Sequence, residues 1–571
     1  TYNNSFGWQR ATELPDFLPS WEYATYYNMA MQNMGKQDAY LPEQIQKYKD
    51  GSDPDNYPNV NHLKWLLESG SGFQHQHNVS IQGGNATTSY NLSIGYRNQE
   101  GLTAKTSNER MTALFSLRSQ LSKSLTLSLN INAYNNKYNA PNGEPTSIDG
   151  IIGYAVREAP IYAGQKSDGS FGYQDNYSPE AWLASESFVE NVSRNINASG
   201  QLRWDTPIKG LSLTGKAGVT YWTKYDKTYR AETYFDENKT VGPSTLNIWT
   251  SNNTNTILEA LVNYEKTFGS HDLKVLAGTS VEQTSNKGLE GYRNTFPNNA
   301  LYQLGAGDAS TATNSSSLEE YALVSFFGRV NYAFKDKYLL EANLRYDGSS
   351  RFAKDNRWGI FPSVSAGWRI SEENFWKNTR AGEVVNNLKL RASYGVLGNQ
   401  NIGVYPYQQT YDLDHNYPLG NPATLVPGTY VSTYRNQDLT WEKTAITNVG
   451  LDFGLFNNTL NGSIEYFYKY TSDILAPVEK AGILGQNVSE SNVGAVSNKG
   501  IEVNLSYNGR IGRDFQFSIA PNFTWVKNAV EELANGATEE INNNRIVGQP
   551  IGIIYGYQTE GLFVDQAEID A

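Results

Sequence analysis

The sequence contains no cysteine, and this absence removes several classes of protein from consideration. Without cysteine there is no disulfide framework, no thiol nucleophile and no cysteine-based metal site. Only five histidines are present, so acid–base catalysis has few groups to use. The sequence also shows no nucleophile elbow of the G-x-S-x-G type, no phosphate-binding glycine loop and no carboxylate pair of defined spacing. We therefore predict that the protein is not an enzyme and has no catalytic residues.

Long hydrophobic runs are also missing, and the mean hydropathy is −0.56. No apolar run approaches the roughly 18–20 residues that a membrane helix needs. A membrane-spanning strand shows lipid only every second side chain, however, so a low average hydropathy is compatible with a membrane barrel. Basic residues are fewer than acidic residues, at 46 against 58. The resulting net charge of −12 disfavours nucleic acid and other polyanions as partners.

Aromatic residues are abundant, at 13% of the chain with 39 tyrosines and 12 tryptophans. The 571 residues exceed the roughly 250–300 at which a single globular core stops growing, yet no linker divides the chain. A barrel resolves this conflict because it grows by adding strands. The length and composition thus favour one large all-β architecture.

Alternation of apolar and polar residues recurs along the chain, as expected for strands with two different faces. Leu340, Leu344 and Tyr346 fall on one face of a predicted strand, whereas Glu341 and Arg345 fall on the other. The apolar face often ends in tyrosine or tryptophan, and such side chains suit a membrane–water boundary. A β-sandwich with one buried face per sheet would show the same alternation.

The lengths of the connections favour a barrel over a sandwich. Long and short connections alternate along the chain, which indicates short turns at one rim and large loops at the other. The connection 372–387 is a longer turn on the short side, and we expect a small helix in it. We predict about seventeen strands, at 1–7, 73–83, 89–98, 110–120, 125–134, 194–204, 211–225, 253–267, 271–285, 318–335, 338–347, 358–371, 388–397, 440–456, 458–472, 493–508 and 514–528.

Ten segments, in order and over nearly the whole chain, resemble the SusC/RagA family of TonB-dependent outer-membrane transporters. They are 2–8 (YNNSFGW), 20–24 (SWEYA), 27–30 (YNMA), 53–59 (DPDNYPN), 77–85 (HNVSIQGGN), 344–352 (LRYDGSSRF), 358–369 (WGIFPSVSAGWR), 394–400 (YGVLGNQ), 439–444 (LTWEKT) and 498–502 (NKGIE). The resemblance implies a transmembrane up-and-down antiparallel β-barrel of 22 strands with long extracellular loops, in the bacterial outer membrane. Residues 1–571 would be part of that barrel, with a plug and TonB box preceding Thr1 and the last strands following Ala571.

The resemblance also implies a function and partners. The intact protein would import a large nutrient, driven by TonB through the plug, with a SusD-like surface lipoprotein as a lid. We expect an oligosaccharide as the substrate. The alternatives are an oligopeptide importer of the same family, or a passive porin or surface-adhesion barrel.

Two predicted loops, 135–193 and 398–439, are rich in aromatic, amide and carboxylate side chains. Flat aromatic rings stack on sugars while amides and carboxylates bond hydroxyl groups, although packing against a lid partner would use the same residues. The candidate substrate contacts are Tyr154, Tyr173, Trp182, Tyr405, Tyr407, Asp412 and Asp414.

Two further clusters could hold a metal, but a structural role is favoured for both. His75 and His77 share one face of a strand without a third ligand nearby in the sequence, which favours packing in the lumen or at an interface. Asp53, Asp55 and Asn56 offer oxygen atoms for Ca²⁺ in an extracellular loop, but their spacing does not match a calcium-binding loop. We therefore predict no cofactor and no metal other than this candidate Ca²⁺ site.

Overall fold

The computed structural model describes residues 1–143, 147–478, 483, 485 and 487–570 of the chain. It contains one main antiparallel sheet of 18 strand segments. These are β1 (Tyr2–Trp8), β2 (Phe73–Gly84), β3 (Thr88–Glu100), β4 (Ser107–Ser122), β5 (Leu125–Pro141), β6 (Phe188–Asp205), β7 (Leu211–Arg230), β10 (Thr245–Phe268), β11 (His271–Asn294), β12 (Thr313–Phe334), β13 (Tyr338–Ser349), β14 (Trp358–Arg369), β15 (Val385–Asn399), β18 (Glu442–Leu455), β19 (Leu460–Ser472), β23 (Ala495–Ile511), β24 (Phe515–Ile519) and β25 (Asn522–Glu532).

All seventeen predicted strands are present. The last predicted strand appears as two segments, β24 and β25, and both pair with β23. The break falls at Ala520-Pro521. Proline has no N–H to donate to a ladder, so it is tolerated at such an interruption.

Short helices and small hairpins occupy the connections. The helices are α1 (Ser20–Asn33), α2 (Pro42–Asp50), α3 (His62–Leu67), α4 (Ile148–Arg157), α5 (Pro179–Ala184), α6 (Asn374–Lys377), α7 (Arg380–Val384) and α8 (Gln566–Asp570). The small strands are β8 (Thr233–Asp236), β9 (Lys239–Val241), β16 (Thr410–Leu419), β17 (Thr424–Tyr434), β20 (Leu475–Ala476), β21 (Asn487–Val488), β22 (Ser491–Asn492), β26 (Glu539–Glu540) and β27 (Arg545–Ile546). None of the described helices combines the length and apolar character needed to span a membrane.

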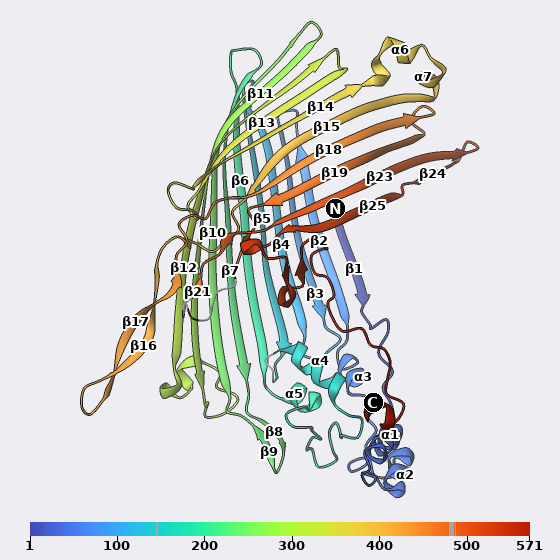
Figure 1. Cartoon of the computed structure of the whole chain (residues 1–571), viewed down its shortest axis with the longest axis vertical. Coiled ribbons are helices and arrows are strands. Elements are labelled where there is room, and N and C mark those ends of the chain that lie inside the picture. The colour runs from blue at the N-terminus through green and yellow to red at the C-terminus, as the bar shows by residue number, and fades with distance from the viewer. Residues whose placement is uncertain (144–146, 479–482, 484, 486, 571) are drawn as a thin grey trace. The chain divides into compact units, whose positions relative to one another are not determined.

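The chain divides into two compact units. Unit 1 comprises Thr1–Arg203, Lys216–Ile257 and Gln283–Glu320, and unit 2 comprises the remaining residues. In unit 1, β1 to β5 pair in sequence order, each antiparallel to the next. In unit 2, β13, β14, β15, β18, β19 and β23 do the same (Figure 1).

Connections therefore alternate between the two ends of the strands. In unit 2 the hairpin β16–β17 lies at the end opposite to α6 and α7 (Figure 1). The turn between β12 and β13 is tight, and Lys335 and Asp336 both have positive φ, at 54° and 53°. A two-residue turn with positive φ at both positions matches the right-handed twist of the two strands that it joins. The small helix expected in 372–387 is confirmed as α6 and α7.

The two faces of the strands differ as predicted. On β13, Leu340, Leu344 and Tyr346 are 48%, 53% and 40% exposed. On the opposite face, Arg345 forms an ion pair with Asp347 at 3.0 Å. An exposed apolar face beside a hydrogen-bonded polar face is the pattern of a strand that meets lipid on one side and water on the other.

Several predicted loop boundaries were wrong. Strand β5 extends to Pro141 and β6 begins at Phe188, although 135–193 was predicted as loop. Hairpin β16–β17 lies within the predicted loop 398–439. Membrane strands need only about 9–11 residues to cross the bilayer, so the ends of β5 and β6 beyond the lipid need no alternation of apolar and polar residues.

Candidate functional site

The predicted contact residues of the first aromatic loop lie around a buried core in unit 1. This loop core consists of Leu63, Leu66, Ile151, Tyr154, Ala155, Phe171, Ala181, Trp182, Leu183, Phe235 and Val241. Helices α4 and α5 are positioned by their N-caps, because Ser147 accepts from Gly150 N–H and Ser178 accepts from Ala181 N–H.

Two of the predicted contact residues belong to this core. Trp182 is 0% exposed, its ring meets Phe235 edge-on at 5.8 Å, and its indole N–H donates to the Asn176 carbonyl at 3.0 Å. Tyr154 is 6% exposed and its ring lies 4.3 Å from that of Tyr177. Both rings hold the loop together from inside and are not accessible to a solute in this structure.

Tyr173 lies at the edge of the loop core. Its ring is 5.6 Å from Phe235, and its hydroxyl donates to Asp236 at 3.4 Å. Burial, and then the neighbouring Asp236 carboxylate, raise the pKa of Tyr173. Of the three predicted aromatic residues in this loop, Tyr173 is the one with a half-buried side chain that a solute could reach.

The second set of predicted residues lies in unit 2, between β15 and β17. The rings of Tyr405 and Tyr407 meet edge-on at 6.1 Å, and both side chains are half-buried. Asp412 lies on β16, in register with Tyr430 of β17. Asp414 is also in β16, but its side chain lies outside the described part of the structure.

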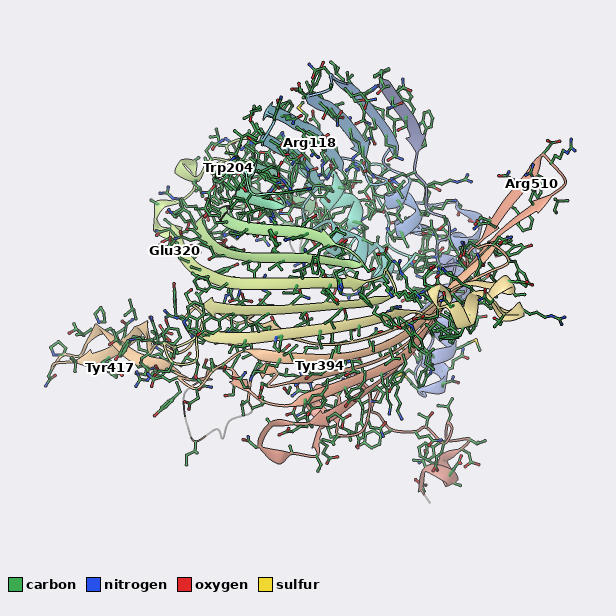
Figure 2. The ribbon with its side chains drawn as sticks, turned by 90° about the horizontal axis from the view of Figure 1, so that it is seen from above. Arg118, Trp204, Glu320, Tyr394, Tyr417 and Arg510 are labelled. Carbon is green, nitrogen blue, oxygen red and sulfur yellow. The ribbon has the colours of Figure 1, made fainter. Side chains whose placement is uncertain are left out.

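The hairpin β16–β17 carries apolar side chains on its surface. Tyr411, Leu413, Tyr417 and Leu425 are 62%, 72%, 51% and 71% exposed. Tyr417 lies on this hairpin beyond one end of the unit 2 strands, whereas Arg510 lies at the other end (Figure 2). Alternation in Thr410–Leu419 is a signal that could have identified β16 from the sequence.

The polar face of unit 2 carries a network of charged groups. Arg391 on β15 pairs with Asp452 on β18 at 3.2 Å and also with Glu465 on β19. Lys389 lies 3.6 Å from Asp452, and Asn448 donates to Glu465. The charges of Lys389 and Arg391 are thus balanced by carboxylates on the neighbouring strands.

This network borders a hollow of about 610 Å³ on the polar face. The hollow is lined by Asn331, Glu341, Ser365, Lys389, Arg391 and Asn448, among others. Amide, hydroxyl and paired charged groups can bond water or a polar solute through many weak contacts. No described group here has the geometry of a nucleophile with its base.

The two candidate metal clusters are both engaged by protein groups. His75 Nδ1 lies 3.1 Å from His77 Nε2, and His77 Nδ1 lies 2.6 Å from the Tyr2 hydroxyl. Phe6 and Tyr96 pack on these rings, so the histidines lie among aromatic side chains on the apolar face of the strands. This position is compatible with the packing role that the sequence favours over metal binding.

The proposed Ca²⁺ ligands are also occupied. Asn56 donates to both oxygens of Asp53, at 3.0 and 3.1 Å. Asp55 accepts from the backbone N–H and the hydroxyl of Ser167. This geometry ties residues 53–56 to the loop that contains Ser167, and a Ca²⁺ site there stays a prediction.

The chain is similar in sequence and in fold to known proteins. Residues 146–563 match the family model described as TonB dependent receptor-like, beta-barrel. A TonB-dependent receptor from Formosa agariphila, P3, is 28% identical over 98% of this chain and 55% of its own length. The TonB-dependent receptor SusC of Bacteroides thetaiotaomicron is 28% identical over 86% of this chain and 52% of its own length.

Solved structures show the same fold. The RagAB peptide transporter superposes with a TM-score of 0.82 and 23% sequence identity, over 96% of this chain and 63% of that chain. The chain spans about half the length of the curated relatives it matches.

Proposed function

We propose, given that the chain belongs to the TonB-dependent receptor-like β-barrel family, that the intact protein imports a large neutral nutrient across the outer membrane. The family assignment confirms the predicted antiparallel membrane barrel of SusC/RagA type and the outer-membrane location. The import activity, the substrate and the partners are our proposal for the whole protein.

An oligosaccharide is the proposed substrate, and the charge arrangement of the polar face is the observation that carries this choice. Arg391 and Lys389 are compensated by Asp452 and Glu465. A wall with balanced charge offers hydrogen bonds without selecting a charged solute. At the loop end, Tyr405, Tyr407 and Asp412 combine aromatic faces with a carboxylate, which suits the apolar and hydroxyl faces of a sugar.

A SusD-like lipoprotein lid is the proposed extracellular partner. Hairpin β16–β17 supports this, because Tyr411, Leu413 and Leu425 expose apolar surface in a connection that leaves the loop end of the strands. Exposed apolar patches of this kind mark protein–protein contacts. TonB would act through a plug.

An oligopeptide is the second candidate substrate, supported by the fold similarity to the RagAB peptide transporter. Calorimetry of the complete transporter with its lid separates the candidates, using neutral oligosaccharides and mixed peptides as ligands. We expect heat of binding from an oligosaccharide. If only peptides bind, the glycan proposal is wrong and the oligopeptide proposal takes its place. In a separate uptake measurement, entry of solutes without TonB would support a porin.

A further inference from the structure

Three ionisable side chains from distant parts of the sequence meet in the loop core of unit 1. His62 is the first residue of α3, Glu158 follows the last residue of α4, and Glu180 lies in the first turn of α5. These residues are 2%, 6% and 3% exposed. Their neighbours are the apolar residues of the loop core, so water is largely excluded from the cluster.

The three side chains point at one another. His62 Nδ1 lies 2.7 Å from Glu180 Oε1 and 3.7 Å from Glu158 Oε2. One ligand atom from each residue lies within 4.8 Å of the other two. Helix caps hold this arrangement, because Asn61 accepts from Lys64 N–H at the start of α3 and Ser178 caps α5.

Most polar atoms of the cluster have no hydrogen-bond partner among the described residues. Both carboxylate oxygens of Glu158, the Oε2 atom of Glu180 and the Nε2 atom of His62 are in this state. The Glu158 side chain is 0% exposed, so bulk water does not supply the missing partners. Buried polar atoms in proteins are almost always paired, and those without a protein partner generally bind a water molecule or an ion.

The charge of the cluster also calls for a cation. A neutral imidazole with two carboxylates places two negative charges among apolar side chains, which is costly. A dication would balance both carboxylates at once, whereas a proton would balance only one.

We propose that His62, Glu158 and Glu180 form a binding site for a divalent transition-metal cation, with Zn²⁺ as the best fit. The ligands would be His62 Nδ1 and one oxygen from each carboxylate. One imidazole with two carboxylates suits Zn²⁺ or Mn²⁺, whereas Ca²⁺ takes about 6–8 oxygen ligands. Zn²⁺ lies about 2.0–2.2 Å from such atoms, so the His62–Glu180 pair would open slightly to admit it.

The site would join α3, α4 and α5 into one rigid unit. Trp182 and Tyr154 are held between these helices, so the cation would fix the loop core that supports Tyr173. A structural metal contributes folding free energy to the segments it connects. This role concerns the architecture of the loops and is independent of the nature of the imported substrate.

Zinc binding to the chelator-stripped complete transporter tests this proposal. We expect one high-affinity Zn²⁺ per chain by calorimetry and metal analysis, weaker Mn²⁺ binding and little Ca²⁺ binding. The variant Glu158→Gln keeps the shape of the side chain but removes the ligand charge. It should weaken Zn²⁺ binding by more than the roughly 10–100-fold that loss of an outer-shell partner costs.

The second histidine cluster supplies a matched control. The double variant His75→Gln/His77→Gln removes the histidine pair of β2 and should leave the Zn²⁺ site intact. Stoichiometric Zn²⁺ binding that persists in Glu158→Gln and disappears in the double variant would overturn the proposal, as would the absence of binding in the wild type. If Glu158→Gln fails to fold, X-ray absorption of the Zn²⁺-loaded wild type decides, with one imidazole and two carboxylates expected in the coordination sphere.

Discussion

The guanidinium group of Arg391 on β15 lies 3.2 Å from the carboxylate of Asp452 on β18, and it also reaches Glu465 on β19. One side chain thus joins three consecutive strands on the polar face. All three side chains are less than one third exposed. Loss of Arg391 would leave Asp452 with Lys389 and Glu465 with Asn448 as their remaining partners in the network.

Replacing Arg391 should therefore destabilise the protein. We expect Arg391→Met to lower the free energy of unfolding by about 1–3 kcal/mol, since two partly buried carboxylates each lose one charged donor. Denaturant unfolding in detergent micelles measures this change. Lys443→Met is the control, because Lys443 and Asp473 are about half exposed and 3.9 Å apart, and such pairs contribute little. Equal effects of the two variants would contradict a structural role for the network.

Trp182 should act as a core residue. We expect Trp182→Ala to cost about 3–5 kcal/mol of local stability, because a large buried ring leaves a cavity. Hydrogen exchange of α4 and α5 would report this loss as faster exchange. Trp65→Ala is the matched control, since Trp65 on the neighbouring α3 is 42% exposed. Protection that is unchanged in Trp182→Ala would mean that the loop core does not depend on this ring.

Tyr405 and Tyr407 are better candidates for contact with a solute than the buried Tyr154 and Trp182. Their half-buried rings leave surface to stack on a sugar. Tyr405→Ala and Tyr407→Ala should each weaken substrate affinity by about 1–3 kcal/mol, the magnitude measured for aromatic rings that stack on nucleic-acid bases. Calorimetry on the complete transporter and growth on the nutrient measure the effect. Tyr26→Ala is the control, because Tyr26 is 57% exposed on α1. Unchanged affinity in both variants would exclude these rings from the site.

The turn between β14 and β15 should respond to acid. Hydrogen bonds from Tyr338, Lys337 and Trp368 lower the pKa of Glu373 to about 2. Because the folded pKa is below the usual value of 4.5, the carboxylate stabilises the turn above pH 4.5. This contribution is lost progressively as the pH falls toward 2.

Hydrogen exchange of residues 370–384, corrected for the intrinsic effect of pH, measures this response. We expect protection to fall in that acidic range in the wild type and to be low and flat in Glu373→Gln. Glu372→Gln is the control, since Glu372 bonds only the exposed Lys377 among the described residues. A wild type without acid sensitivity in this segment would show that the three hydrogen bonds do not hold the turn.

The barrel could be predicted from the sequence because its signals are local and repeated. Alternation such as Leu340 against Glu341 identifies a strand, and the contrast of turns with loops identifies the two rims. The loop structure could not be predicted in the same way. Nothing in the sequence shows that Trp182 on α5 packs into the loop core against Phe235. His62 meets Glu180 across 118 positions of sequence. Hairpin β16–β17 carried an alternating signal, but strand prediction centred on membrane spans did not select it.

The absence of cysteine makes the central claim directly measurable. Single variants at Leu340→Cys, Glu341→Cys, Asn343→Cys and Leu344→Cys can carry spin labels without any background substitution within residues 1–571. In lipid bilayers we predict collisions with oxygen at positions 340 and 344 and with a water-soluble nickel complex at positions 341 and 343. Such a two-residue period places lipid on one face of β13 and water on the other. Positions 340 and 344 that contact only the water-soluble complex, or neither reagent, would contradict a membrane-spanning barrel.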